Sequence, residues 1–345
     1  MMKRLLIIFL LLATAVSACA PSEPDVITLM THDSFAISEA TIAAFEAENG
    51  VTLELLPSGD TGAALNQAIL AKEAPLADVF FGVDNTFMGR ALASGIFQAY
   101  DSPLLAEIPD ELKLDAENRL LPVDYGDVCL NYDKAWFAEN DLPLPQSLAD
   151  LTQPMYADLL VVENPATSSP GLTFLLATIA EFGEDGYLDF WAALRANGLL
   201  VTNGWEEAYY GSFSVASDGE RPLVVSYASS PPAEVIFADP PVAEAPSASL
   251  VAPGMCFRQI EFVGILAGTE KRELAEKLVD FMLGQLFQED MPLNMFVYPA
   301  NENASLPDEF VQWTQVPEET AVLTPQIINA NREKWIEAWT ETVLR

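Results

Sequence analysis

Histidine, cysteine and the acidic residues are the side chains of this sequence best able to do chemistry, and the first two are scarce. The 345 residues include one histidine, His32, and three cysteines, against 51 Asp and Glu. A catalytic triad or Cys–His dyad has His32 as its one imidazole base, and no nucleophile motif such as G-x-S-x-G accompanies it. One imidazole with so few thiols does not make a zinc site. We therefore predict a protein that is not an enzyme and holds no metal.

The charge balance of the chain limits its partners. Lys and Arg number 16 against 51 Asp and Glu, which gives a formal net charge of −35 at pH 7, and 50% of the residues are hydrophobic. That apolar fraction supports large cores. So acidic a protein repels phosphate groups, which excludes nucleic acid as a partner, whereas a cationic small ligand is permitted. No P-loop and no G-x-G-x-x-G motif is present, and we predict no cofactor.

Eight short strings combine polar, glycine and aromatic residues near the ends of apolar runs, where they are candidate walls of a binding cleft. The ring faces of Trp205, Tyr227 and Phe296 are suited to stacking on a cationic ring. Asp60 offers a carboxylate that can accept a hydrogen bond or balance a positive charge. The strings are residues 31–35, 58–62, 82–85, 123–126, 164–171, 201–209, 225–227 and 296–299.

A capped helix start is predicted at residues 168–171, which read S-S-P-G. The N–H groups of Gly171 and Leu172 are expected to be free there, and such a helix end binds anions or a hydroxyl. The cleft would then be aromatic and acidic at one end and lined by amide donors at the other.

Each of these residues also has a plainer interpretation when taken alone. Trp205 and Tyr227 are large enough to be core residues. Ser169 and Pro170 are typical of an ordinary helix start. His32 is a packed histidine in that interpretation. Only the ordered set of strings favours a site.

The apolar runs that must position these strings alternate between strand and helix patterns. The order strand, helix, strand, helix, strand over residues 26–83 is typical of an α/β fold with a parallel sheet. Residues 230–253 are rich in Pro, Ala and Ser and are expected to form a long irregular surface connection. Strands are expected at residues 26–30, 51–56, 78–83, 121–132, 159–162, 199–202, 223–227 and 259–266, and helices at 38–49, 61–72, 172–182, 188–196, 270–286 and from 324 onward.

The first residues have the layout of an export signal. A basic start precedes the eight apolar residues 5–12, and the stretch is too short for an ordinary transmembrane helix. The string V-S-A-C at residues 16–19 resembles the bacterial lipoprotein box. It predicts that residues 1–18 are a lipoprotein signal peptide, that Cys19 carries the lipid attachment, and that residues 19–25 form a tether. The alternative is a plain secretory signal.

Two cysteines remain after Cys19. An even pair in an exported protein favours a disulfide between Cys129 and Cys256. The alternative is a pair of buried free thiols. A disulfide would link parts of the chain that lie far apart in the sequence.

Taken in order, the strings resemble the periplasmic thiamine-binding proteins of bacterial ABC importers, within the iron- and polyamine-type receptors. The resemblance spans about residues 26–340 and rests on T-S-S-P-G at 167–171, N-G-W-E-E-A-Y at 203–209, D-S-F at 33–35 and W-I-E-A-W at 335–339. It implies an α/β fold of the periplasmic-binding-protein type (type II), a two-lobed Venus flytrap joined by crossing strands. Lobe 1 would comprise residues 26–122 and 260–305, lobe 2 residues 123–259, and residues 306–345 a C-terminal helical segment packing across the lobes.

The resemblance also implies which residues contact the ligand. Asp60 and Thr61 match the family's Asp-Gly pair before the second helix, and His32 stands where relatives have a Tyr. Phe296 stands where relatives have a Trp, and a second Tyr of the family falls on Ala233, which leaves one wall of the pocket in question. The expected ligand-binding residues are His32, Asp60, Thr61, Ser168, Trp205, Tyr227 and Phe296.

A receptor without catalytic activity follows from this resemblance. It would bind thiamine or a thiamine phosphate between its lobes and deliver it to an ABC importer permease subunit. We expect a monomer that is extracytoplasmic and held at the membrane by its lipid anchor. Two alternatives remain: a receptor for another solute, such as a polyamine or a metal chelate, and a thiamine-degrading transferase on the same fold with Cys129 as its nucleophile.

Overall fold

The strands of the protein form one continuous sheet. A computed structural model describes residues 25–345, and the strands within them make a single sheet of 11 strands. The predicted lipid site at Cys19 and the signal peptide lie outside the described residues. The strands are β1 (Asp25–Thr31), β2 (Val51–Pro57), β3 (Val79–Asp84), β4 (Phe97–Gln98), β5 (Leu121–Asp133), β6 (Leu160–Glu163), β7 (Leu200–Thr202), β8 (Leu223–Tyr227), β9 (Ser247–Leu250), β10 (Phe257–Leu266) and β11 (Tyr298–Pro299).

The two ends of this sheet repeat one arrangement. At one end, β1 lies between β2 and β3, all three are parallel, and β3 pairs antiparallel with β10. At the other end, β6 lies between β7 and β8, all three are parallel, and β8 pairs antiparallel with β5. We call the end with β1–β3 lobe 1 and the end with β6–β8 lobe 2. The predicted two-lobed α/β fold is confirmed; the exact lobe boundaries remain a prediction.

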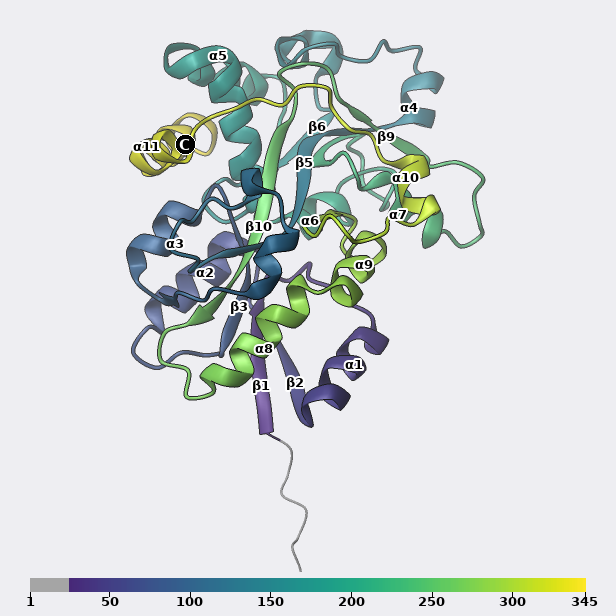
Figure 1. The fold of residues 1–345 in the computed structure, drawn as a ribbon. Helices are drawn as coiled ribbons and strands as arrows, with labels where there is room; N and C mark the ends of the chain where they lie inside the picture. Colours follow the sequence, from purple (N-terminus) through teal and green to yellow (C-terminus); the bar gives the residue numbers. More distant parts are fainter. Residues whose placement is uncertain (1–24) are drawn as a thin grey trace, which may run out of the picture.

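Two long strands join the lobes. The antiparallel pair β5 and β10 runs from one lobe to the other (Figure 1). The predicted disulfide is present: Cys129 in β5 is bonded to Cys256, the residue before β10, with an S–S distance of 2.09 Å. Both cysteines are fully buried. The bond ties the crossing strands together inside lobe 2.

Helices cover both faces of the sheet, and several of them begin at a residue whose side chain caps the first turn. Ser38 caps α1 by accepting from the Thr41 N–H, and Gly50, in the left-handed region at φ 66°, ends that helix. The helices are α1 (Glu39–Asn49), α2 (Thr61–Leu70), α3 (Met88–Ser94), α4 (Lys134–Glu139), α5 (Ser169–Ala196), α6 (Trp205–Tyr209), α7 (Pro231–Ile236), α8 (Arg272–Leu283), α9 (Gln285–Asn294), α10 (Asp308–Trp313) and α11 (Pro325–Val343), with four short 3₁₀ turns at Pro103–Glu107, Asp110–Leu112, Leu148–Thr152 and Pro154–Tyr156.

The last helix contacts both lobes. Helix α11 packs against α5 of lobe 2 and α3 of lobe 1 (Figure 1). Trp339 meets Trp191 of α5 edge-to-face at 5.5 Å between ring centres. On the other side, the Arg332 guanidinium lies 4.2 Å from the ring centre of Phe87, just before α3. Helix α11 therefore contacts both lobes and packs across the junction between them.

Two sequence expectations need correction, and a third is confirmed. Residues 230–253 are not a wholly irregular connection, because they contain α7 and the strand β9, which pairs with β5. The predicted helix 270–286 ends at Leu283, because Gly284 has an extended backbone, and a separate helix, α9, follows from Gln285. The two helices predicted at 172–182 and 188–196 are confirmed: together they make up α5, and they meet at a kink at Gly183, whose φ of 71° is left-handed.

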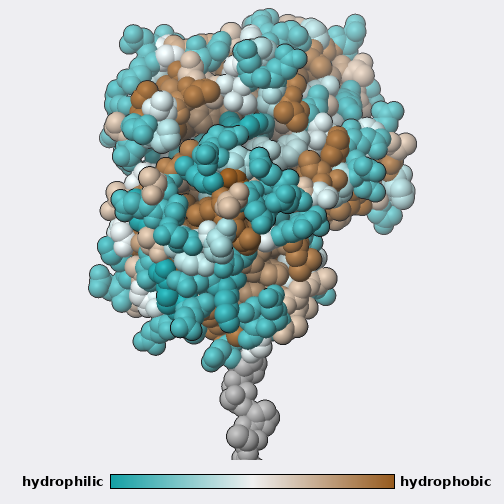
Figure 2. Space-filling view, in the orientation of Figure 1, coloured by the Kyte–Doolittle hydropathy of each residue, from teal (hydrophilic) through white to brown (hydrophobic). Residues whose placement is uncertain are grey.

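The surface is mixed in polarity. Hydrophilic residues cover much of the lower half in the space-filling view, and apolar residues gather in separate patches on the upper half and near the middle (Figure 2). Within residues 25–345, the helices are too short or too polar for any of them to cross a membrane.

Candidate ligand-binding site

A cavity lies where the carboxyl ends of the parallel strands of both lobes meet. Its volume is about 320 Å³, within the range of small-molecule sites. Lobe 1 contributes the segments after β1 and β2, and lobe 2 contributes those after β6, β7 and β8, as expected for ligand crevices of α/β sheets. Six of the seven predicted ligand residues line it: His32, Asp60, Thr61, Trp205, Tyr227 and Phe296.

Ser168, the seventh predicted residue, lies behind the cavity wall. It is fully buried, and its Oγ accepts from the Gly171 N–H at 3.5 Å, while its carbonyl accepts from the Leu172 N–H at 3.0 Å. The prediction of free N–H groups at Gly171 and Leu172 is therefore wrong, because the helix cap and the first helical bond engage both. The neighbours Ser169 and Pro170 line the cavity in its place.

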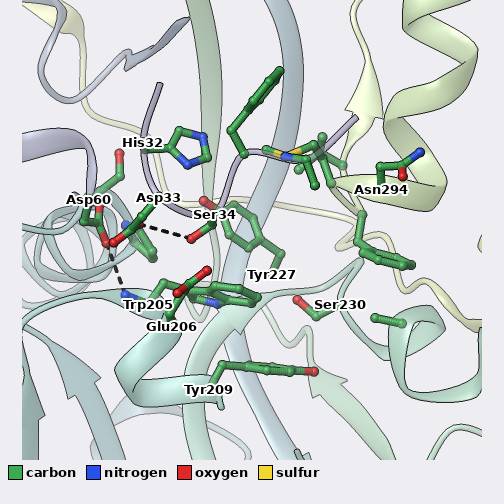
Figure 3. A pocket seen from close by; sticks show the side chains of 18 of the residues that line it. His32, Asp33, Ser34, Asp60, Trp205, Glu206, Tyr209, Tyr227, Ser230 and Asn294 are labelled. Atoms are coloured by element: carbon green, nitrogen blue, oxygen red, sulfur yellow. Dashed lines mark hydrogen bonds between the residues drawn. The ribbon is translucent and has the colours of Figure 1, made fainter. Parts of the chain in front are cut away.

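Asp60 joins the two lobes through its carboxylate. Oδ1 accepts from the N–H groups of Thr61 at 2.7 Å and Ser169 at 3.1 Å, and Oδ2 accepts from the Trp205 N–H at 3.1 Å (Figure 3). Thr61 begins α2 of lobe 1, whereas Ser169 and Trp205 begin α5 and α6 of lobe 2. Burial raises the pKa of Asp60, and the N–H groups of Ser169 and Trp205 oppose that rise. One carboxylate thus serves the starts of three helices.

Trp205 is positioned by its polar edge and by a stacked neighbour. Its Nε1 donates to the Ser226 Oγ at 2.9 Å, and that oxygen lies 2.9 Å from the Ser230 Oγ. The indole stacks on Tyr209, with ring centres 4.9 Å apart and planes 21° apart. Trp205 is partly buried and lines the cavity, so its position differs from that of a core tryptophan such as Trp191.

Tyr227 lies over a glycine of the crossing strand β5. A Cβ at Gly126 would stand 2.8 Å from the Tyr227 Cδ1, so a larger residue would displace the ring. The Tyr227 hydroxyl accepts from Gln259 Nε2 at 3.0 Å. Burial raises the pKa of Tyr227 well above its ordinary value, and the nearby carboxylates Glu261 and Asp60 add to the effect. The phenol is therefore neutral at pH 7 and available as a hydrogen-bonding wall.

His32 is both packed and exposed to the cavity. Its Nε2 lies 3.4 Å from Glu261 Oε1, and its ring fits against Gly82, where a Cβ would come within 2.5 Å of the imidazole. Burial lowers the pKa of His32, but Glu261, Asp60 and Asp33 outweigh burial and raise it above the ordinary value. The imidazole is consequently biased toward its protonated form by the carboxylates around it.

An aromatic residue that the sequence did not indicate lines the cavity together with Ala233. Phe237, directly after α7 and four residues beyond Ala233, meets Phe296 edge-to-face at 5.7 Å, and both phenylalanines line the cavity. Phe296 itself has a left-handed backbone at φ 55°. Phe237 and Phe296 therefore form the cavity wall on which the family's second Tyr would fall.

Several cavity residues were not predicted as ligand residues. Some belong to strings that carried the resemblance, so their neighbours in the sequence were a usable signal. Others, in β10 and at the end of α9, are brought in only by tertiary packing. The unpredicted residues include Asp33, Ser34, Phe35, Glu206, Tyr209, Tyr210, Phe237, Glu261, Asn294 and Met295.

Three carboxylates lie side by side across the crossing strands beneath the cavity. Glu261 of β10 is in register with Asp84 of β3 on one side and Asp124 of β5 on the other. Burial raises the pKa of Asp84 to about 7, although its Oδ1 accepts from Thr86 and Phe87. Burial, followed by the charge of Glu261, raises the pKa of Asp124 well above its ordinary value. Asp84 and Asp124 therefore retain protons that exposed carboxyls would release.

The disulfide bears directly on the transferase alternative. The transferase alternative is wrong, because Cys129 is bonded to Cys256 and is fully buried away from the cavity lining. Among residues 25–345, no three His, Cys, Asp or Glu side chains are grouped so as to hold a metal ion.

Known proteins resemble this chain over nearly its whole length. The family model of bacterial extracellular solute-binding proteins matches residues 74–317. The thiamine-binding periplasmic protein of Escherichia coli K12 is 32% identical over 344 residues, covering 97% of this chain and 98% of the relative. That of Salmonella typhimurium LT2 is 32% identical over 353 residues, covering 100% of both. A solved structure of a periplasmic thiamin binding protein matches with a TM-score of 0.82 and 30% identity, over 94% of this chain and 98% of that one.

These matches agree with the two lobes, the crossing strands and the cavity between them. The family model alone covers more than half of the chain, and the relatives cover almost all of it. The chain belongs to the bacterial extracellular solute-binding proteins.

Proposed function

We propose that this protein is the thiamine receptor of an ABC importer and performs no reaction of its own. The observation that carries the proposal is the convergence of aromatic rings and carboxylates from both lobes on one cavity. The near full-length similarity to thiamine-binding periplasmic proteins supports the same ligand. Membership of the family makes the protein extracytoplasmic.

The cavity chemistry suits thiamine. Thiamine contains a permanently cationic thiazolium ring, an aminopyrimidine ring and a hydroxyethyl tail. Trp205, Tyr227 and Phe296 offer ring faces or edges, and a cation–π contact contributes about 0.5–2 kcal/mol per ring. Asp60 and Glu261 can accept from the amino group or balance the cation.

Binding between the lobes gives the receptor its mechanism. A ligand that contacts residues of both lobes stabilises the closed arrangement by its differential affinity for that state. We propose that the closed protein then delivers thiamine to the permease subunit, as a monomer tethered through lipidated Cys19. The lobe boundaries at residues 122–123 and 259–260 and the role of residues 306–345 belong to this proposal.

Calorimetric titration tests the ligand. The protein would be titrated with thiamine, with spermidine as the polyamine alternative and with ferric citrate as the metal-chelate alternative. We expect saturable heat with thiamine and much weaker or no binding of the other two. Saturable binding of spermidine or ferric citrate with no response to thiamine would replace the proposal by the corresponding alternative.

A further inference from the structure

We propose that the row of carboxyls across β3, β10 and β5 is a proton-binding site that gives up a proton when a cationic ligand enters the cavity. The carboxyl row consists of Asp84, Glu261 and Asp124, and His32 belongs to the same site. This inference rests on the proposed function and adds to it a link between ligand binding and pH. It is carried by the contacts of Glu261, which belongs both to the cavity lining and to the row.

The side chains of the carboxyl row lie against one another because their strands place them opposite each other. Glu261 of β10 pairs with Asp84 of β3 and with Asp124 of β5. Directly opposite residues of neighbouring strands point to the same face of a sheet, with Cβ atoms about 4.5–5.5 Å apart. The pairing of β10 with β5 shifts register directly after Glu261, and the pairing with β3 shifts after Phe262. Such irregularities re-aim side chains beside a site.

Unpartnered buried oxygens favour protons in the carboxyl row. Asp84 and Asp124 are fully buried, and within the described residues one oxygen of Asp84 and both of Asp124 accept no hydrogen bond. A carboxylate buried in that state is costly, whereas a protonated carboxyl can donate to the acid beside it. Burial accordingly raises the pKa of Asp84 to about 7 and that of Asp124 well above its ordinary value. The row therefore carries protons at neutral pH.

Glu261 connects the carboxyl row to the cavity. Its side chain is buried, yet it lines the cavity together with His32. Glu261 Oε1 lies 3.4 Å from His32 Nε2, and that nitrogen is buried without a hydrogen-bond partner in the described part of the chain. A ligand that reaches this side of the cavity therefore meets an acid and an imidazole that both border the row.

The charges around the row leave a place for a cation. The titratable groups that face the row and His32 from the neighbouring segments are Asp33 and Asp60 on the loops of lobe 1, Glu206 on α6, Tyr227 on β8 and Arg332 on α11. Figure 3 shows Asp33, Asp60 and His32 toward the same side of the cavity. Arg332 attracts Asp84 from outside the cavity and is itself hydrogen-bonded to Glu333. Among the described residues that line the cavity, His32 is the one whose side chain can be positive.

A cation beside the row releases protons from both kinds of group. A nearby positive charge favours the ionised form of a carboxyl and disfavours the protonated form of an imidazole. Asp84, with a pKa of about 7, and His32, whose pKa is raised above its ordinary value, are both partly protonated at pH 7. Their responses have the same direction, so ligand binding sends protons to the solvent. The affinity for a cationic ligand consequently rises with pH and falls in acid.

Calorimetry of the wild-type protein counts the released protons. Thiamine is titrated at pH 7 in PIPES, HEPES and Tris, whose ionisation enthalpies differ, so that the observed heat includes proton exchange with the buffer. We expect release of about half a proton or more per thiamine, and about tenfold tighter binding at pH 8 than at pH 6. Heat that does not depend on the buffer, or uptake of protons, would overturn the inference and leave the proposed function standing. Absence of thiamine binding at every pH would instead remove the proposed function and this inference with it.

Replacing the two buried aspartates assigns the protons to the row. In the double variant Asp84→Asn with Asp124→Asn, each amide keeps the shape of a protonated carboxyl but does not ionise. We expect thiamine still to bind, with the proton release lowered at least about twofold.

Asp127→Asn is the matched control for the double variant. Asp127 is likewise buried in β5, but it lies outside the cavity lining, and both of its oxygens accept from Arg258 at 2.9 Å. A carboxylate that has its own cationic partner does not exchange protons with the row. This control should therefore keep the wild-type proton release.

The contrast between these variants identifies the source of the proton. If the double variant keeps the wild-type release, the proton comes from the ligand or from another group, and the role of the row is wrong. An equal decrease in Asp127→Asn would contradict that role too, because any loss of buried charge on β5 would then suffice. If the double variant does not fold, Asp84→Asn alone is expected to lower the release by at least about a third, and an unchanged release there would overturn the role of the row.

Discussion

Trp205 combines a held indole with a position on the cavity wall. The Ser226 hydroxyl accepts from its Nε1, and Tyr209 stacks on the indole from within lobe 2. These contacts fix the ring before any ligand arrives, so little side-chain entropy is lost on binding. Loss of the ring therefore removes a preorganised stacking surface.

Trp205→Ala is expected to weaken thiamine binding by more than tenfold, because both the stacking area and any cation–π contact are lost. Isothermal calorimetry gives the affinity, and circular dichroism with thermal unfolding checks that the variant is folded. Trp136→Ala, a partly buried tryptophan outside the cavity lining, is the control and should keep its affinity. An unchanged dissociation constant in a folded Trp205→Ala protein would remove Trp205 from the site.

The kinds of residue in the site were predictable, but their contacts were not. Trp205, Tyr227 and Asp60 stand out in the sequence because their types and order match a ligand cleft. Asp60 was assigned to the ligand, whereas its carboxylate accepts from N–H groups of the opposite lobe. No local pattern encodes that contact, because it depends on how the two lobes meet. Glu261 could not be predicted as a site residue either, because a single acidic residue in an apolar strand is common.

At the scale of elements, the crossing strands β5 and β10 and their neighbour β3 carry a row of buried carboxylates. Asp84, Glu261 and Asp124 lie at neighbouring positions of β3, β10 and β5. Within the described residues, both side-chain oxygens of Asp124 and one of Asp84 are buried without a hydrogen-bond partner. Such groups are stable when protonated and costly when ionised.

The buried carboxyl of Asp84 makes stability depend on pH. Its pKa is raised to about 7, so the folded state retains a proton that the unfolded chain releases above about pH 4. The contribution to stability is fully present below pH 4 and is lost as pH rises through 7. Asp84→Asn is expected to reduce the loss of unfolding free energy between pH 5 and pH 8 by about 2–3 kcal/mol.

Urea denaturation at pH 5 and at pH 8 measures the slope of the unfolding free energy against pH. Asp124 adds to it in the same direction, so Asp84→Asn should flatten it without abolishing it. Exposed Asp185→Asn serves as the control and should keep the wild-type slope. A wild-type slope in Asp84→Asn would show that Asp84 is ionised in the folded protein.

The disulfide stabilises the junction of the crossing strands. It connects residues separated by 127 positions, and a closed loop of that size restricts the unfolded chain strongly. The double variant Cys129→Ala with Cys256→Ala is expected to lose about 2–5 kcal/mol of unfolding free energy, measured by denaturant titration. Thiamine affinity should change less than threefold, because neither cysteine lines the cavity. A large loss of affinity with unchanged stability would contradict this structural role.

Most helices and strands were predictable from the periodicity of apolar residues in the sequence. The elements that were missed have physical causes. Buried parallel strands such as β3 are continuous apolar runs, and long helices have an apolar stripe. Helix α7 and strand β9 were missed because prolines and small residues dominate residues 230–253, and β9 owes its formation to pairing with β5. Gly284 and Gly183 interrupt helices through their own backbone angles.

At the scale of the whole molecule, repetition of one strand arrangement explains the position of the site. In both lobes the central strand, its parallel neighbours and an antiparallel crossing strand follow the same order. The carboxyl ends of six parallel strands of the described chain therefore face one region, where their loops meet between the lobes. The net charge of −35 draws in cations generally, while the cavity lining selects among them.

The most direct test of the receptor account is a crystal structure of the protein grown with thiamine. We expect ligand density in the cavity between the lobes, with a ring of thiamine against Trp205 or Tyr227 and a carboxylate close to the cation or the amino group. An empty cavity at saturating thiamine, or thiamine bound only elsewhere on the protein, would contradict it.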